Sequence, residues 1–289
     1  YIVKVKRSTG ILHPKRIFKC KKVILSGGVM GSVKLLMECK RKGSLQNISS
    51  ELGNFIRSNS EAILGVKTPK ADSELTKGIA ISAGFHPNKD THIETFRYGM
   101  KQNMMGLLTT QMTDINQKAG LASWALNFIK HPIRNFMYFF PRKWSERGIF
   151  LLVMQPLNNY LRFVHERKWW KFGGVSINTK NESKQPIPGR IKIGEELASN
   201  IAGKLGGTCS TTYTSAILNI PTTAHILGGA RLANSSEDGV INEDLEVFGY
   251  KGLYVIDGSS VPANLGVNPS LTITALAEYA MDRFPSKGA

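Results

Sequence analysis

The sequence predicts a mixed α/β fold in which both ends of the chain build one α/β unit and the middle builds a mixed β-sheet covered by helices. Two observations lead to this prediction. Each end contains a short apolar strand followed by glycine and then by a helical segment, at residues 23–39 and again at 253–284. The stretch from 61 to 113 has the pattern typical of strands. The expected division is therefore 1–60 and 207–289 for the first unit, and 61–206 for an inserted second unit.

At the amino-terminal end we expect a strand over residues 1–6, where apolar side chains alternate, and a turn at Gly10. Residues 23–25 then form a short buried strand, Ser26-Gly27-Gly28 ends it, and a helix follows over 31–39. This unit partly resembles a dinucleotide-binding turn, but Ser26 stands where the first glycine belongs. An ordinary tight strand-to-helix turn explains the same pattern, and both interpretations stay open.

The middle is predicted to consist of strands with two helical stretches. The expected strands cover residues 62–66, 79–85, 92–98, 107–110 and 149–154, and residues 160–164 and 175–177 are expected to continue the same sheet. Residues 121–140 have a helical pattern that His131-Pro132 must break or kink. A second helix over 193–205 ends at Gly206-Gly207. The last elements are a strand over 253–256 and a helix over 271–284.

The composition is that of a globular protein and leaves several partners open. Hydrophobic residues make up 42% of the 289 residues, and 38 Lys and Arg against 21 Asp and Glu give a net charge of +17. This charge is compatible with nucleic acid, anionic lipid or acidic ligands, and an ordinary basic surface also explains it. No nucleic-acid-binding motif accompanies it, so we expect no nucleic acid partner.

The cysteines indicate the redox compartment of the protein, and the cysteines and histidines together show no metal-binding pattern. Three cysteines form no CxxC or metal-ligand pattern, which argues against a disulfide framework and favours a reducing compartment. No metal site is predicted. No signal peptide or membrane-spanning run is present, and the sequence starts at Tyr1 inside a predicted strand. We therefore expect a fragment of a longer protein, with a cytoplasmic or membrane-peripheral location.

A helix start near the carboxyl end is a candidate binding site. Asn268 is placed to cap this helix, with Pro269 at the first helical position and Thr272 in the first turn. Such a start aims backbone N–H groups and the positive end of the helix dipole at whatever lies in front of it. An ordinary capped helix is the alternative interpretation.

Two further motifs accompany this helix start. Asp257-Gly258 follows an apolar strand, and ligands in α/β folds bind beyond the carboxyl ends of strands. His225 lies in a predicted loop and could hydrogen-bond a substrate hydroxyl and take its proton. A simple turn and a structural histidine are the alternatives.

Several runs of the chain together match one family pattern. At the carboxyl end these runs are His225-Ile226-Leu227-Gly228-Gly229, Leu253-Tyr254-Val255-Ile256-Asp257-Gly258-Ser259, Gly266-Val267-Asn268-Pro269 and Thr272-Ile273-Thr274-Ala275-Leu276-Ala277-Glu278. Further runs are Val23-Ile24-Leu25-Ser26-Gly27-Gly28, Asn59-Ser60-Glu61 and Leu151-Leu152-Val153-Met154-Gln155. They resemble the glucose–methanol–choline (GMC) oxidoreductase superfamily, specifically its cholesterol-oxidase-like branch.

The resemblance implies a flavoenzyme that moves a hydride from a secondary alcohol to FAD. It implies that His225 and Asn268 flank the flavin and hold the substrate hydroxyl, and that Glu94 is a further acid/base. For Glu94, a solvent-facing glutamate or one paired with Arg97 is the alternative. The helix start at Asn268 would face the flavin edge where reduction places negative charge. The cofactor-binding residues implied are Gly27, Gly28, Asn59, Asp257, Gly258, Asn268, Pro269 and Thr272.

The expected function is that of the carboxyl-terminal part of an FAD-dependent oxidoreductase. The family's amino-terminal unit, with the glycine-rich loop for the ADP half of FAD, is missing from this sequence, and we expect it upstream. The substrate would be a sterol or another lipophilic alcohol, with oxygen or another acceptor reoxidising the flavin. His225 or Glu94 would deprotonate the hydroxyl, directly or through water. The alternative is a truncated, non-catalytic module of the same fold that binds lipid or a partner.

The middle of the chain combines aromatic and basic residues, which is typical of a face that lies on anionic lipid. The apolar members are Trp124, Phe128, Ile129, Ile133, Phe136, Met137, Phe139 and Phe140. The basic members around them are Lys130, Arg134, Arg142, Lys143 and Arg147, and a second basic and aromatic group is Arg162, Arg167, Lys168, Trp169, Trp170 and Lys171. We expect peripheral contact with an anionic membrane; helices packed on the sheet with basic residues outside are the alternative.

Overall fold

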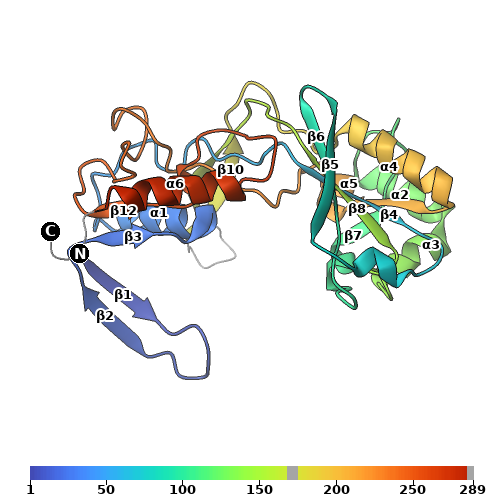
Figure 1. Cartoon of the computed structure of the whole chain (residues 1–289), viewed down its shortest axis with the longest axis horizontal. Coiled ribbons are helices and arrows are strands. Elements are labelled where there is room, and N and C mark those ends of the chain that lie inside the picture. The colour runs from blue at the N-terminus through green and yellow to red at the C-terminus, as the bar shows by residue number, and fades with distance from the viewer. Residues whose placement is uncertain (168–174, 285–289) are drawn as a thin grey trace.

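The chain has two hydrophobic cores, which lie in two lobes of the computed structural model (Figure 1). The structure describes residues 1–167 and 175–284. Helices and strands are mixed in both lobes, so the predicted α/β class is confirmed. The domain boundaries after residues 60 and 206 stay a prediction. None of the helices in the described ranges has both the length and the apolar character needed to cross a bilayer.

The first lobe is built from both ends of the chain. Its elements are β1 (Ile2–Lys6), β2 (Lys15–Lys19), β3 (Val23–Leu25), α1 (Lys34–Arg41), β12 (Leu253–Val255) and α6 (Ser270–Asp282). Strands β3 and β12 pair in parallel, while β1 and β2 form an antiparallel hairpin that extends away from the lobe (Figure 1). The chain leaves β3 at Gly28, whose φ of 67° is a conformation that favours glycine, and α1 follows a π-helical turn over Val29–Val33.

The second lobe is a six-stranded antiparallel sheet with the strand order β5-β6-β8-β4-β11-β7. The strands are β4 (Ala62–Lys67), β5 (Ile81–Asn88), β6 (Thr91–Phe96), β7 (Thr109–Gln111), β8 (Gly148–Met154) and β11 (Thr208–Thr212). The helices are α2 (Leu121–Lys130), α3 (Pro132–Phe136), α4 (Lys192–Leu205) and α5 (Tyr213–Leu218). The predicted break at His131-Pro132 therefore separates α2 from α3.

One face of this sheet is closed by helix α4. Leu64 and Val153 belong to the second core, and Gly194 of α4 packs directly against both of them. A Cβ added at Gly194 would lie 2.6 Å from Val153 Cγ2, so glycine allows the helix to approach the sheet closely. This face is an ordinary apolar core.

The opposite face carries both polar and aromatic side chains. In the register of β6, β8 and β4, Glu94 pairs with Leu152, which pairs with Ile63. In the next row, Phe96 pairs with Phe150. Directly paired residues of antiparallel strands point to the same side of a sheet. The face therefore changes from a polar end near Glu94 to an aromatic end near Phe150.

Two strand predictions for the middle of the chain are wrong. Residues 160–164 and 175–177 do not continue the large sheet. They lie in β9 (Leu161–Arg167) and β10 (Val175–Asn181), a separate antiparallel pair whose Phe163 packs in the first core. Residues 107–110 begin as part of a 3₁₀ turn over Met104–Leu108, and β7 starts only at Thr109. Alternation shows that a strand is half-buried but not which core covers it.

Because β9 and β10 return to the first core, the chain passes between the two cores four times. The passages lie between Ile56 and Ala62, Val153 and Phe163, Ile177 and Ile191, and Ala202 and Ala230. Glu61 lies in the first passage, His225 lies in the fourth, and Glu94 lies at the polar end of the sheet.

Candidate active site

A buried carboxylate–imidazole pair joins Glu61, just before β4, to the predicted site residue His225. Glu61 is fully buried, and its Oε2 accepts a hydrogen bond from His225 Nδ1 at 2.9 Å. The Ala224 N–H donates to Oε1 at 2.9 Å, and the Thr223 hydroxyl donates to Oε2 at 3.2 Å. Because a carboxylate only accepts, the neutral ring carries its proton on Nδ1 and has its lone pair on Nε2. None of the described residues hydrogen-bonds Nε2, so this nitrogen can still accept a hydrogen bond from a ligand.

The backbone that aims Glu61 is unusual. Asn59 and Ser60 are both buried and have φ values of 59° and 42°, in the left-handed region that non-glycine residues rarely occupy. The Asn59 side chain holds this conformation: its Oδ1 accepts from the Gly266 N–H at 2.7 Å, and its Nδ2 donates to the Val267 carbonyl at 2.9 Å. Asn59 thus fixes the segment before Glu61 to the loop before α6. Its predicted contact with a cofactor stays a prediction.

A second buried carboxylate–imidazole pair contains Glu94 and His92, both on β6. His92 Nε2 lies 3.0 Å from Glu94 Oε1, and Asn268 Nδ2 donates to the two carboxylate oxygens at 2.9 and 2.7 Å. Glu94 is 8% exposed, and Arg97 instead donates to the Ser82 hydroxyl. The solvent-facing and Arg97-paired alternatives for Glu94 are therefore wrong. The structure brings Glu94 and Asn268 together, but neither hydrogen-bonds His225.

The prediction that Asn268 caps a helix is also wrong. Helix α6 begins at Ser270, Pro269 takes the capping position, and no side chain caps the helix. The Asn268 Nδ2 donates to Glu94, and the Oδ1 atom, which would accept from the helix backbone in a cap, has no partner among the described residues. As a result, the backbone N–H groups in the first turn of α6 keep their capacity to bind a ligand. Thr272 is half-buried in this turn.

The remaining predicted cofactor-binding residues connect β3, β12 and their helices. Asp257 accepts hydrogen bonds from the Ser32 hydroxyl and from the Ser259 N–H, and the Gly27 N–H donates to Ser32 Oγ at 3.0 Å. A Cβ at Gly258 would lie 3.3 Å from side-chain atoms of Leu227 and Ile273, whereas one at Gly28 would meet nothing within 4 Å. Asp257 and Gly258 therefore have structural contacts of their own, and the roles of Gly27, Gly28, Asp257 and Gly258 toward a cofactor stay predictions.

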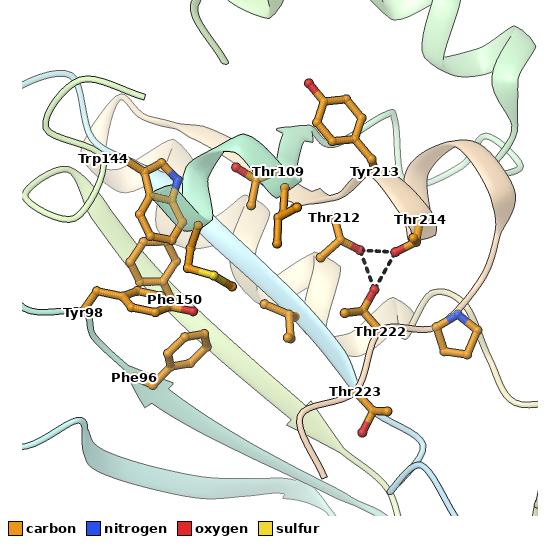
Figure 2. Close-up of a pocket in the computed structure, with 14 residues that line it drawn as sticks. Phe96, Tyr98, Thr109, Trp144, Phe150, Thr212, Tyr213, Thr214, Thr222 and Thr223 are labelled. Atoms are coloured by element: carbon orange, nitrogen blue, oxygen red, sulfur yellow. Dashed lines mark hydrogen bonds between the residues drawn. The ribbon is translucent and has the colours of Figure 1, made fainter. Parts of the chain in front are cut away.

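A cavity of about 400 Å³ lies on the same sheet face as the two pairs (Figure 2). One wall is aromatic, and the other consists of threonines whose three hydroxyls form a closed triangle of hydrogen bonds, 2.6 to 3.0 Å long. The aromatic wall consists of Phe96, Tyr98, Trp144 and Phe150, and the triangle of Thr212, Thr214 and Thr222.

The cavity is apolar in character and directly adjoins the first pair. Burial raises the pKa of the Tyr98 phenol and also that of Tyr213, which lines the cavity as well, so both stay uncharged at neutral pH. The three threonine hydroxyls satisfy one another and leave their methyl groups for a ligand. Thr223 lines the cavity and donates to Glu61. The cavity is therefore suited to a large apolar ligand whose polar end lies near His225.

Sequence reasoning missed Glu61, His92 and the cavity. Glu61 stands in one of the runs that carry the family resemblance, yet nothing in its own neighbourhood identified the histidine 164 residues later that it binds. His92 shows no metal-ligand spacing, but its position two residues before Glu94 on one strand places both side chains on one face.

Comparison with known proteins shows what this chain is similar to. A family model described as GMC oxidoreductase matches residues 196–277. The chain is 39% identical to a cholesterol oxidase of Mycobacterium tuberculosis over 98% of its own length and 50% of that protein's. It is also 39% identical to a cholesterol oxidase of Acinetobacter baumannii, over 94% of this chain and 49% of that protein. It thus spans about half the length of the curated relatives that it matches.

A solved structure supports the fold alone. A pyridoxine 4-oxidase from Mesorbium loti superposes with a TM-score of 0.51 at 12% identity, covering 93% of this chain and 52% of that one. The sequence matches show that the chain is similar to GMC oxidoreductases at its carboxyl end and to cholesterol oxidases over nearly its full length. Both sequence relatives named above are cholesterol oxidases.

Proposed function

We propose that this chain forms the substrate-binding and catalytic part of an FAD-dependent enzyme that oxidises the CH–OH group of a sterol or a similar lipophilic alcohol. The observation that carries the proposal is that one sheet face combines an apolar cavity with two buried carboxylate–imidazole pairs, Glu61–His225 and Glu94–His92. Oxidation of an alcohol needs a group that takes the hydroxyl proton, and an apolar substrate needs an apolar site. The cholesterol oxidase relatives support the substrate class.

The residues present are compatible with a flavin at this site. Asn268 Oδ1 is buried and has no hydrogen-bond partner among the described residues, so a donor on a bound ligand would satisfy it. The first turn of α6 is uncapped and favours negative charge in front of it. We infer that Asn268, Thr272 and the Gly28 turn would hold FAD. When bound, FAD would supply the acceptor for the substrate's hydride.

The protein's own groups would then position the substrate and move its proton. Glu61 holds the His225 ring by Nδ1, so Nε2 accepts the hydroxyl proton and the buried carboxylate stabilises the charged ring. Asn268 is fixed by Glu94 and would orient the reacting end. Glu94, directly or through a water molecule, is the alternative base. The aromatic wall would hold the apolar body of the substrate and exclude water.

We also propose that the helices beside the sheet contact an anionic membrane. Ile129 and Ile133 are 73% and 78% exposed, and Phe136 and Phe140 are more than half exposed, which is unusual for residues packed on a sheet. Arg134 and other basic residues of the same segment would bind lipid headgroups. In the second predicted group, Lys168, Trp169, Trp170 and Lys171 lie outside the described residues. Sedimentation with vesicles of anionic, but not of neutral, lipid would support this proposal.

The test of the proposed function uses this chain together with the half of the relatives' length that it does not span. The protein is mixed anaerobically with a 3β-hydroxysterol while the flavin absorbance is followed. Bleaching that returns on admission of air supports a sterol oxidase, and bleaching without rapid return supports a dehydrogenase with another acceptor. Bound flavin that never bleaches rejects the sterol. A protein that binds no flavin contradicts the proposal and favours the non-catalytic lipid- or partner-binding module.

A further inference from the structure

A continuous line of hydrogen bonds leads from Glu94 to the protein surface. His92 Nε2 lies 3.0 Å from Glu94 Oε1, and His92 Nδ1 lies 2.9 Å from His86 Nε2 on the neighbouring strand β5. The exposed fraction of the side chain is 10% for Glu94 and 14% for His92, whereas His86 is exposed. Both ring nitrogens of His92 are therefore engaged, one toward the buried carboxylate and one toward solvent.

The two strands are shaped to allow this line. Gly84 pairs with Glu94, and a Cβ at Gly84 would lie 2.8 Å from His92 Nε2 and 3.2 Å from Glu94 Cγ. Glycine in a strand weakens pairing, so its presence here has a steric reason. The β5–β6 register also shifts between Phe85 and Asn88, and His86 lies in this irregular stretch. Such irregularities turn a side chain in a new direction.

In the part of the chain that the structure describes, the hydrogen bonds and strand partner of His92 involve no charged side chain other than Glu94. Its neighbours are Glu94 on its own strand, His86 on β5 and the uncharged Met154 opposite it on β8. From the loop before α6, uncharged Asn268 contacts Glu94. Among the described residues, no three His, Cys, Asp or Glu side chains form a group that could hold a metal ion. Binding of a metal does not explain the arrangement.

We propose that His92 and His86 form a proton-exit relay that returns Glu94 to its carboxylate form after each turnover, an inference that rests on the proposed function. Oxidation of the alcohol to a carbonyl passes the hydride to the oxidant, FAD, and leaves the hydroxyl proton on the protein. Glu94 takes that proton from the hydroxyl directly or, through water, from His225. Its O–H then donates the proton to His92 Nε2 while His92 Nδ1–H passes a proton to His86 Nε2, and His86 releases its Nδ1 proton to water. This leaves both rings with their proton on Nε2, and proton exchange with water returns them to the Nδ1–H tautomer before the next turnover.

The test compares the first turnover with later turnovers in the complete, FAD-loaded protein. His92→Gln keeps a polar side chain but cannot take a proton at one nitrogen and release one from another. We expect flavin bleaching by a 3β-hydroxysterol in the first turnover to stay within about twofold of wild type. Proton release, followed with a pH-indicator dye, should slow about tenfold together with steady-state turnover. Added imidazole should restore both, which a merely structural role would not allow.

The control is His165→Gln. His165 is on β9, lies beside Glu38 of α1 and is far in the sequence from Glu94, His92 and His86. Its proton release should match wild type. Wild-type timing of proton release in His92→Gln, or loss without imidazole rescue, would overturn the relay while leaving the proposed function intact. If His92→Gln does not fold, the exposed His86→Gln replaces it, with a smaller slowing expected. If the wild-type protein itself is not bleached by alcohol, the proposed function fails and the relay with it.

Discussion

The two carboxylate–imidazole pairs on one sheet face differ in what lies beyond the ring. In the first, Glu61 is fully buried and His225 has one ring nitrogen on Glu61 and the other without a partner among the described residues. In the second, His92 bridges Glu94 to His86, and Glu94 also accepts from Asn268. The first line of hydrogen bonds ends at His225, and the second continues to solvent.

The difference shows that similar side chains take different roles according to their connections. A histidine with one fixed nitrogen and one free nitrogen is suited to accept a proton from a ligand. A histidine with both nitrogens bound is suited to pass a proton onward. We therefore expect the first pair to act in the chemical step and the second to restore the site between turnovers. The following variants, examined in the complete FAD-loaded protein, test this contrast.

The largest effect is expected from Glu61→Gln. The substitution removes the charge that stabilises protonated His225 and fixes its tautomer, so the first-turnover rate should fall by about 10²- to 10⁴-fold. Rapid-mixing absorbance measures this rate, and far-UV circular dichroism checks folding. Glu196→Gln, on the exposed side of α4, is the control. An unchanged first turnover would remove His225 from the role of base.

Glu94→Gln should have a smaller effect and act at a different stage. The amide cannot receive the proton that the relay exports, so steady-state turnover should fall about 10- to 100-fold while the first turnover changes less. The ratio of the two rates is the measurement. If the first turnover falls as strongly as it does in Glu61→Gln, Glu94 is the base and the assignment of the two pairs is reversed.

Asn268→Asp would place a second carboxylate against Glu94, at the position where an amide now lies 2.7 Å away. Two carboxylates this close would share one proton at neutral pH, so activity should become dependent on that proton and decline as pH rises. A pH profile of kcat/KM measures the change, with Asn200→Asp on the exposed face of α4 as control. A profile with the wild-type shape would show that Asn268 does not contact Glu94 in the working enzyme.

The smallest effect is expected from Thr223→Val. It removes one hydroxyl that donates to Glu61 at 3.2 Å but keeps the shape of the side chain. A hydrogen bond to a charged group contributes about 1.5 to 3 kcal/mol, and this bond is long, so we expect the low end, about a tenfold loss of first-turnover rate. Thr179→Val, exposed on β10, should match wild type. A loss comparable to that of Glu61→Gln would mean that the hydroxyl, rather than the carboxylate, controls His225.

Local sequence signals were enough for the α/β class and for most individual elements. Strand-like patterns located β4 and β6, an apolar run located β8, and the glycines after α4 marked its end, because these features depend on neighbouring residues only. The assignment of β9 and β10 to the large sheet was wrong because the cover of a strand depends on distant residues. Family resemblance supplied His225, Asn268 and Glu94. It could not supply their partners Glu61 and His92, which depend on strand register and on side-chain direction.

The four passages of the chain between its cores determine how the molecule can come apart. A proteolytic cut in any one passage leaves three others intact, so a nicked protein should stay assembled under native conditions. No contiguous segment contains all of one core without part of the other, because each core draws on segments from both sides of residues of the other core in the sequence. Unfolding of either core alone would therefore disrupt part of the other core. Heating should produce one cooperative unfolding transition rather than two.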